Sequence, residues 1–270
     1  MAFDGFLPAL AAVIPALFLA GGVYIYVALV RQISVRVTDP SAPPVRGFGW
    51  PEAILATVLV TVFVHGIAAS ARHEMSAIQT RDLIANALFS IGLLLFIAAF
   101  LRLRRLDINA LGGFSKIGFG RAVTIGGILL LAAYPLVLLA EVVTQKLSRG
   151  PLEKQGIVEL FNASTTLEQR IWIILLAVTV APLAEEFFFR FFLYGVVKRY
   201  FGRGVGIVAS ALLFAAVHAH LPSFAPLFVL GICFAIAYEW SGSLLVSMTM
   251  HAFFNALALI ALAFPEVIPQ

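Results

Sequence analysis

The sequence has little charge and almost no cysteine. Asp, Glu, Lys and Arg make up only 12% of its 270 residues, about half of the roughly 25% that soluble domains carry. Cys233 is the single cysteine, which excludes an internal disulfide and a metal cluster built on cysteines. Because it lies in an apolar run, we expect it to pack in the interior. The net charge of +4 is small and indicates no nucleic-acid partner.

Apolar residues dominate instead. They form 61% of the chain, with a mean hydropathy of +1.01, and a soluble domain of this length could not bury so much apolar surface in one core. A helix that crosses the ~30 Å hydrocarbon layer needs about 20 apolar residues. We therefore predict an all-α polytopic membrane protein, with residues 1–270 as one integral membrane domain. The eight expected spans are roughly 6–30, 51–71, 82–101, 121–144, 171–197, 205–221, 224–240 and 243–262.

Basic residues set the expected orientation, because cytoplasmic loops retain Lys and Arg. One side of the predicted bundle carries eleven of them and the other side six. The richer side holds Arg31, Arg36, Arg46, Arg102, Arg104, Arg105, Lys116, Arg121, Lys198, Arg199 and Arg203, and the poorer side Arg72, Arg81, Lys146, Arg149, Lys154 and Arg170. This bias predicts that both termini lie outside the cytoplasm. The first apolar run has no basic start and no clear cleavage site, so we expect a retained helix.

Ionisable and amide side chains interrupt three of the late apolar segments. They are Glu185, Glu186 and Arg190 in 171–197, His218 and His220 in 205–221, and His251 and Asn255 in 243–262. A charge near the bilayer centre costs at least ~2.5–3.5 kcal/mol, so such residues mark functional sites. At a rise of about 1.5 Å per residue the three groups reach similar depths. We therefore expect a cavity between these three segments.

Spacing assigns different partners to the two glutamates. Residues four apart share a helix face, so Glu186 and Arg190 are expected to pair, whereas Glu185 points about 100° away and has no such partner. A glutamate held out of water binds a proton readily and can act as a general base on water. Histidines and an asparagine nearby can orient that water or donate to a developing oxyanion. These groups suit peptide hydrolysis, although helix–helix hydrogen bonding and proton transport use the same residue types.

Other intramembrane hydrolase signatures are incomplete. The segment "HEMSA" at 73–77 ends in Ala77, so the second histidine of a HExxH zinc site is missing. The segment "SGS" at 241–243 is not a GxSG serine site. Asp82, at a boundary, is the only aspartate that touches the predicted spans, which disfavours an aspartyl protease.

Three motifs in the last segments resemble the CAAX protease and bacteriocin-processing family of intramembrane endopeptidases. They are EExxxR in "EEFFFR", FxxxH in "FAAVH" and HxxxN in "HAFFN". The resemblance covers about residues 170–262, the expected catalytic core. It implies that Glu185 activates water with His218, that His251 and Asn255 stabilise the transition state, and that Glu186, Arg190 and Phe214 support them. The implied substrate is a membrane-associated protein or peptide.

Metal dependence stays open at this stage. Glu185, His218 and His251 have the residue types of a His₂Glu zinc site, but a glutamate that binds zinc is not free to act as a base. We therefore favour a mechanism without a cofactor and keep zinc as the alternative. The short loops favour a bacterial cytoplasmic (inner) membrane. A non-catalytic scaffold or bacteriocin-immunity factor with the same fold is the main alternative function, and a proton-coupled transporter is a weaker one.

Overall fold

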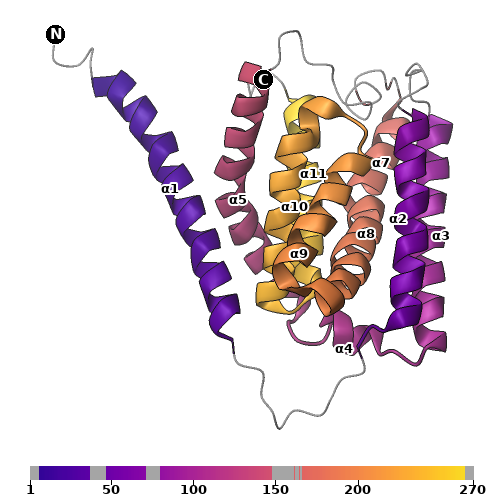
Figure 1. Cartoon of the computed structure of the whole chain (residues 1–270). Helices are drawn as coiled ribbons and strands as arrows, with labels where there is room; N and C mark the ends of the chain where they lie inside the picture. Colours follow the sequence, from indigo (N-terminus) through magenta and orange to yellow (C-terminus); the bar gives the residue numbers. More distant parts are fainter. Residues whose placement is uncertain are drawn as a thin grey trace.

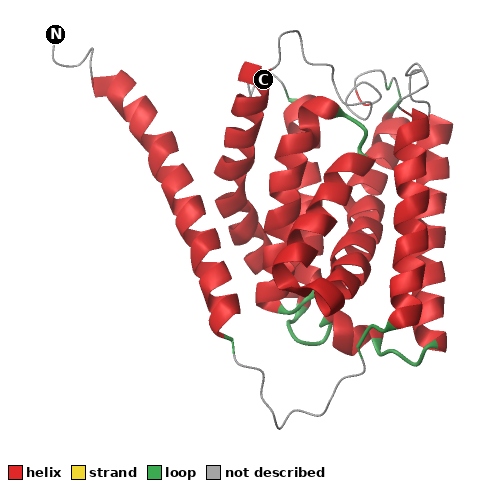
Figure 2. Ribbon diagram, viewed as in Figure 1, coloured by secondary structure: helices red, strands yellow, loops and turns green. Residues whose placement is uncertain are grey.

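The computed structural model describes residues 6–36, 47–70, 80–147, 161, 164 and 166–264. Within these residues the chain forms helices and no strand (Figure 2). The helices are α1 (Phe6–Val35), α2 (Trp50–Ser70), α3 (Thr80–Leu103), α4 (Ile108–Gly112), α5 (Phe119–Leu147), α7 (Leu167–Leu175), η1 (Leu176–Val180), α8 (Ala181–Glu186), η2 (Phe187–Leu193), α9 (Tyr194–Val217), α10 (Leu221–Ser241) and α11 (Leu244–Ala263).

Among the described residues, seven continuous helical stretches are long and apolar enough to cross a membrane. This confirms the prediction of an all-α polytopic membrane protein. The "HEMSA" segment at 73–77 and several loop residues counted for the orientation, such as Arg46 and Lys154, lie outside the described residues.

The longest stretch, Leu167–Val217, is a hairpin of two spans. It contains 51 residues, and its backbone leaves the helical conformation at Gly202 (φ 83°, ψ 172°). Glycine adopts a positive φ at little steric cost, so the chain can reverse at this position. The first arm runs through η2 into the start of α9, the second arm is the part of α9 after Gly202, and η2 packs against α9; α9 and the neighbouring α8 are labelled in Figure 1. The expected spans 171–197 and 205–221 are therefore the arms of this hairpin, which accounts for seven stretches where eight spans were expected.

Helix α10 lies at the centre of the bundle. It contacts α1, α5, α9 and α11 (Figure 1), and its sequence is apolar on every face, as expected for a helix with neighbours all round. Helix α2 packs on α9, and α3 packs on α8 and η1. These contacts surround α8 and the two glutamates with protein.

One end of the bundle is held together by a charged network. Glu239, near the end of α10, accepts hydrogen bonds from Lys198 (2.6 Å) and from the Tyr194 hydroxyl (2.7 Å). It also lies 2.9 Å from Nε of Arg203, and Arg203 donates to the Ile33 carbonyl oxygen of α1 (3.0 Å). The network joins α1, α9 and α10 close to the Gly202 turn. Glu239 therefore has a structural role at this end of the bundle.

Candidate active site

Glu186 and Arg190 form a fully buried ion pair. Nη1 of Arg190 lies 2.9 Å from Oε1 of Glu186, and both side chains have no exposed surface. The pairing predicted from the i, i+4 spacing is therefore confirmed. The Arg190 guanidinium lies over the rings of Phe214 (4.2 Å to the centroid) and Phe234 (5.1 Å), so cation–π attraction adds to the ion pair.

Gly231 allows this guanidinium to fit. Nη2 of Arg190 donates to the Gly231 carbonyl oxygen at 3.4 Å. A Cβ on Gly231 would lie 3.1 Å from Cα of Ala211 and 3.3 Å from Nη2 of Arg190. The absence of a side chain at Gly231 therefore lets α10 approach α9 and the buried arginine.

His251 is the second partner of Glu186. Nδ1 of His251 donates to Oε1 of Glu186 at 3.0 Å, and the imidazole stacks on the Phe234 ring at a centroid distance of 5.0 Å. This contact was not expected from the sequence, where Glu186 was assigned to Arg190 alone. Since a ring nitrogen that donates to a carboxylate carries a proton, Nε2 is the nitrogen left for other chemistry.

Glu185 faces a cavity instead of the ion pair. Its side chain is 27% exposed, and Oε2 lies 3.9 Å from Nε2 of His251, which is long for a hydrogen bond. Oε2 has no hydrogen-bond partner among the described residues. The carboxylate is thus close to an imidazole and open to a ligand.

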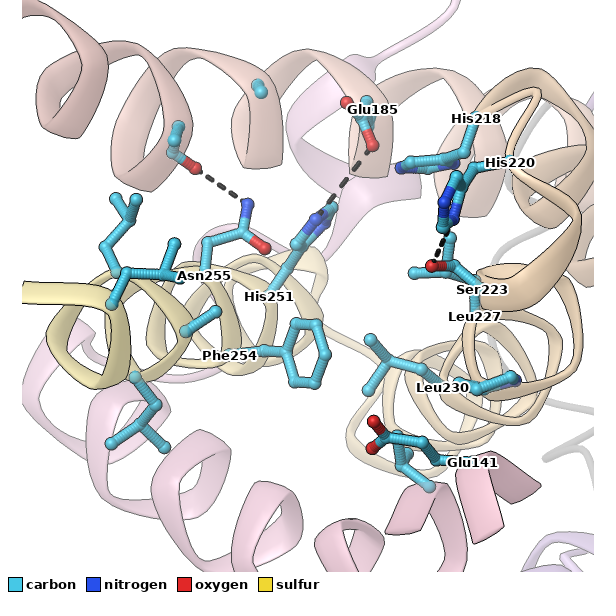
Figure 3. A pocket seen from close by; sticks show the side chains of 18 of the residues that line it. Glu141, Glu185, His218, His220, Ser223, Leu227, Leu230, His251, Phe254 and Asn255 are labelled. Carbon is cyan, nitrogen blue, oxygen red and sulfur yellow. Dashed lines mark hydrogen bonds and ion pairs between the residues drawn. The ribbon is translucent and has the colours of Figure 1, made fainter. Parts of the chain in front are cut away.

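His218 reaches the same cavity from the end of α9 (Figure 3). Its Nδ1 donates to the Phe214 carbonyl oxygen at 2.7 Å. In the neutral imidazole this leaves Nε2 unprotonated, able to accept a hydrogen bond. The Phe214 ring packs edge-on against His218 (4.9 Å) and His251 (5.6 Å). The phenylalanine of the FxxxH motif therefore orients both histidines as well as covering Arg190.

Asn255 is held by a backbone carbonyl of η1. Its Nδ2 donates to the Ala177 carbonyl oxygen at 2.8 Å (Figure 3). In η1 the hydrogen bonds run from residue i to i−5, as from the Ala181 N–H to the Leu176 carbonyl. The next donor in this series would be residue 182, but Pro182 has no N–H. Asn255 therefore donates the hydrogen bond that Pro182 cannot donate to the Ala177 carbonyl oxygen.

Two π-helical segments flank the glutamates. η1 precedes α8 and η2 follows it, so Glu185 and Glu186 lie in a short α-helical stretch between wider turns. Regular α-helix was expected here. Such turns are frequent at functional sites. Neither the run of phenylalanines after the glutamates nor the apolar residues before them predicts π-helical turns. Of the local signals, only Pro182 is informative.

The cavity has a volume of about 700 Å³. Besides the three segments expected to enclose it, residues of α3, α5 and α10 line it. His220 and Ser223 lie in its wall and are hydrogen-bonded to each other (2.7 Å), in agreement with a place for His220 near the site. Glu141 of α5 also lines the cavity, where Gln145 donates to it at 3.4 Å.

A second cavity of about 500 Å³ meets the first at Glu185 and His218. It lies between α2, α3 and the glutamate segment, and its wall includes Phe63, Phe188 and Phe189. The phenylalanines of η2 are at most 5% exposed, so they pack inside the protein.

The residue types of a zinc site are present, but their arrangement does not fit one. Among the described residues, no three His, Cys, Asp or Glu side chains are placed to hold a metal ion together. Nδ1 of His251 is hydrogen-bonded to Glu186, so only its Nε2 is left to bind a metal. Glu185, His218 and His251 therefore do not form a ligand set in this structure.

Comparison with known proteins locates one family match. Residues 167–257 match the family described as "Type II CAAX prenyl endopeptidase Rce1-like". No curated protein and no solved structure matches the chain. The matched segment begins at the start of α7 and contains every motif residue described above. The resemblance to the CAAX-type intramembrane endopeptidases is thereby confirmed for residues 167–257.

Proposed function

We propose that this protein is an intramembrane endopeptidase that hydrolyses a peptide bond of a membrane-associated protein or peptide. One observation carries the proposal. The Glu185 side chain, which is 27% exposed, lines a cavity together with His218 and His251 and has no hydrogen-bond partner at Oε2 among the described residues. A free carboxylate beside imidazoles is suited to general-base catalysis.

In the proposed reaction a water molecule in the cavity donates a hydrogen bond to Glu185 and another to Nε2 of His218. As the water oxygen bonds to the peptide carbonyl carbon, one water proton moves to the Glu185 carboxylate. The carbonyl oxygen becomes an oxyanion. Glu185 then gives the proton to the leaving nitrogen and the C–N bond breaks. The products are an amine and a carboxylic acid, which ionises.

Two donors are available for the oxyanion. The Asn255 amide nitrogen carries two protons, of which one is bound to the Ala177 carbonyl oxygen. The second can reach the cavity. A protonated His251 can donate from Nε2 while Glu186, hydrogen-bonded to Nδ1, stabilises the imidazolium. Glu186 is then a positioning residue, comparable to the carboxylate that orients the histidine of a hydrolase triad.

We propose that this chemistry needs no metal. The support comes from the donor geometry, because Glu185 acts as a base only if it is not a ligand, and Glu186 is already bound to Arg190 and His251. The protein is an integral membrane protein, as its apolar helices indicate. We place it in a bacterial cytoplasmic membrane on the basis of its compact loops.

The second candidate function is a scaffold or immunity factor that keeps the fold without turnover. This alternative is favoured because three motif residues, Glu186, Arg190 and Asn255, stabilise contacts between helices. It does not account for the position of Glu185, which lines the cavity, lies 3.9 Å from His251 and has no hydrogen-bond partner at Oε2 among the described residues. A proton-coupled transporter has no specific observation in its favour.

The test is direct proteolysis. Purified protein in liposomes should cleave fluorescently quenched casein, and mass spectrometry should show products that result from internal peptide-bond hydrolysis. The matched Glu185→Gln variant keeps the shape of the side chain but removes the base, so it should be inactive while still folded. Equal activity of wild type and Glu185→Gln would contradict the proposal.

A further inference from the structure

Charge is strongly segregated between the two ends of the bundle. Among the described residues, ten basic and three acidic ones lie at the end that contains α4 and the Gly202 turn, which we call the basic end. They are Arg31, Arg36, Arg102, Arg104, Arg105, Lys116, Arg121, Lys198, Arg199 and Arg203, with Glu52, Asp107 and Glu239. The opposite end has three of each sign, namely Arg81, Lys146, Arg170, Asp82, Glu141 and Glu168.

Contacts between distant segments fix the basic end as one surface. Arg36 of α1 donates to the Trp240 carbonyl oxygen of α10 at 2.8 Å. Arg104 after α3 pairs with Glu52 of α2 at 3.0 Å. The network around Glu239 joins α1, α9 and α10, and the Trp50 ring of α2 lies against the Tyr200 ring of α9 at a centroid distance of 5.2 Å, so these five helices meet at one end. The positive-inside rule then places the basic end in the cytoplasm.

The cavity belongs to the other half of the bundle. Its wall uses the C-terminal parts of α5 and α11, from Tyr134 and from His251 onward, and the N-terminal half of α10, up to Leu230. All these parts point away from the basic end (Figure 1). Glu185 is 17 residues from Gly202, at most about 25 Å along the helix at the α-helical rise of 1.5 Å per residue, because the wider turns of η2 shorten it, in a hydrocarbon layer of ~30 Å. It is therefore closer to the face opposite the basic end.

We infer that the cavity opens on the non-cytoplasmic face of the membrane. One consequence rests on the proposed function. If the protein is an endopeptidase, its substrate is an exported or membrane-anchored peptide segment whose scissile bond lies in the outer half of the bilayer. A cytoplasmic lipidated C-terminus, the substrate that the name of the matched family suggests, would meet the basic end and not the cavity.

Cysteine labelling tests the direction of the cavity without requiring activity. Cys233 is the only cysteine, so a Cys233→Ala background is free of other thiols. In this background, Gln145→Cys reports on the cavity mouth, and Ala258→Cys reports on its wall; both positions are exposed and line the cavity. Arg199→Cys, exposed at the basic end, is the matched control. The probe is a membrane-impermeant disulfonated maleimide added to intact cells.

The expected result is labelling of the Gln145→Cys and Ala258→Cys variants in intact cells, with Arg199→Cys labelled only after permeabilisation. Labelling of Arg199→Cys alone in intact cells would overturn the inference. A second outcome would also overturn the inference: Gln145→Cys is labelled, but Ala258→Cys does not react before or after permeabilisation. The cavity would then not open to water on that face.

A second measurement separates this inference from the proposed function. Fluorescently quenched casein is added to right-side-out and inverted membrane vesicles, with Glu185→Ala as the inactive control. Cleavage restricted to right-side-out vesicles supports the inference, and cleavage restricted to inverted vesicles overturns it. If neither vesicle type nor detergent-solubilised protein cleaves casein, the proposed function loses its support, while the labelling result still decides which way the cavity opens.

Discussion

Glu186 has partners in two directions: it forms an ion pair with Arg190, four residues further along the chain, and accepts a hydrogen bond from His251 at 3.0 Å across the bundle. The two glutamates of the EExxxR motif therefore differ in their contacts and in their exposure. Glu186 connects an arginine to a histidine inside the protein, whereas Glu185 is exposed to the cavity.

Glu186→Ala should destabilise the protein much more than Glu185→Ala. It leaves Arg190 as a buried charge without its anion, and breaking a buried ion pair costs about 3–5 kcal/mol. Glu185 is partly exposed and makes no comparable contact, so its truncation should leave stability nearly unchanged. Thermal unfolding of both variants in the same detergent measures the difference. The reverse order would mean that the roles of the two glutamates are exchanged.

Gly231→Ala should also destabilise the protein. The added methyl group would lie 3.1 Å from Cα of Ala211 and 3.3 Å from Nη2 of Arg190, and overpacking of this kind costs about 1–3 kcal/mol. Gly92→Ala in α3 is the matched control, because its Cβ would meet nothing within 4 Å. In a helix that change should be neutral or stabilising by about 0.5–1 kcal/mol. A tolerated Gly231→Ala would show that α10 can shift away from Arg190.

The structural and catalytic roles of Asn255 can be separated through Pro182. Asn255→Ala should lower stability by about 0.5–1.5 kcal/mol, the net value of a typical hydrogen bond. Pro182→Ala in the same chain restores an N–H that can donate to the Ala177 carbonyl oxygen. The double variant should therefore recover thermal stability but not proteolysis. Recovery of both would make Asn255 a purely structural residue.

The unprotonated Nε2 of His218 should matter more than Nδ1. Nδ1 donates only to the Phe214 carbonyl oxygen, a contact that the amide of His218→Asn can imitate. The longer His218→Gln places an acceptor near the Nε2 position. We expect both variants to fold and His218→Gln to keep the higher kcat. The loss in His218→Asn should be about 10²–10⁴-fold, the usual range for acid–base groups. Equal losses would argue against water orientation by Nε2.

Metal dependence is tested by elemental analysis together with dialysis against a chelator. We expect substoichiometric zinc in purified protein and full activity after dialysis, because Glu185 acts as a base in the proposed reaction. Stoichiometric zinc, with activity lost on its removal and regained on its return, would make Glu185, His218 and His251 ligands. Zinc content alone gives a readout even before a good substrate is known.

Local spacing was sufficient for part of this site. The Glu186–Arg190 pair follows from a separation of four residues, and the separation of Glu185 from it follows from the helical angle. The membrane spans follow from apolar length. The catalytic and oxyanion roles of Glu185, His218, His251 and Asn255 stay predictions.

Other features depend on tertiary contacts that no local pattern encodes. Glu186 and His251 are 65 residues apart, and their hydrogen bond exists because α11 packs against α8. The π-helical turns are set by the same packing and by one proline. The fit of Arg190 depends on Gly231 in a different helix. In the sequence Gly231 is a small residue within an apolar run, and nothing around it indicates this role.

The Gly202 turn also sets a length. Glu185 lies 17 residues before it and His218 lies 16 residues after it, so the two cavity-facing side chains sit at nearly the same height on the two arms of one hairpin. A helical residue turns by about 100°. One residue inserted into either arm would therefore swing one of these side chains out of the cavity and raise it by about 1.5 Å. Insertions or deletions between Glu185 and His218 are therefore compatible with the site only if they fall in the turn itself.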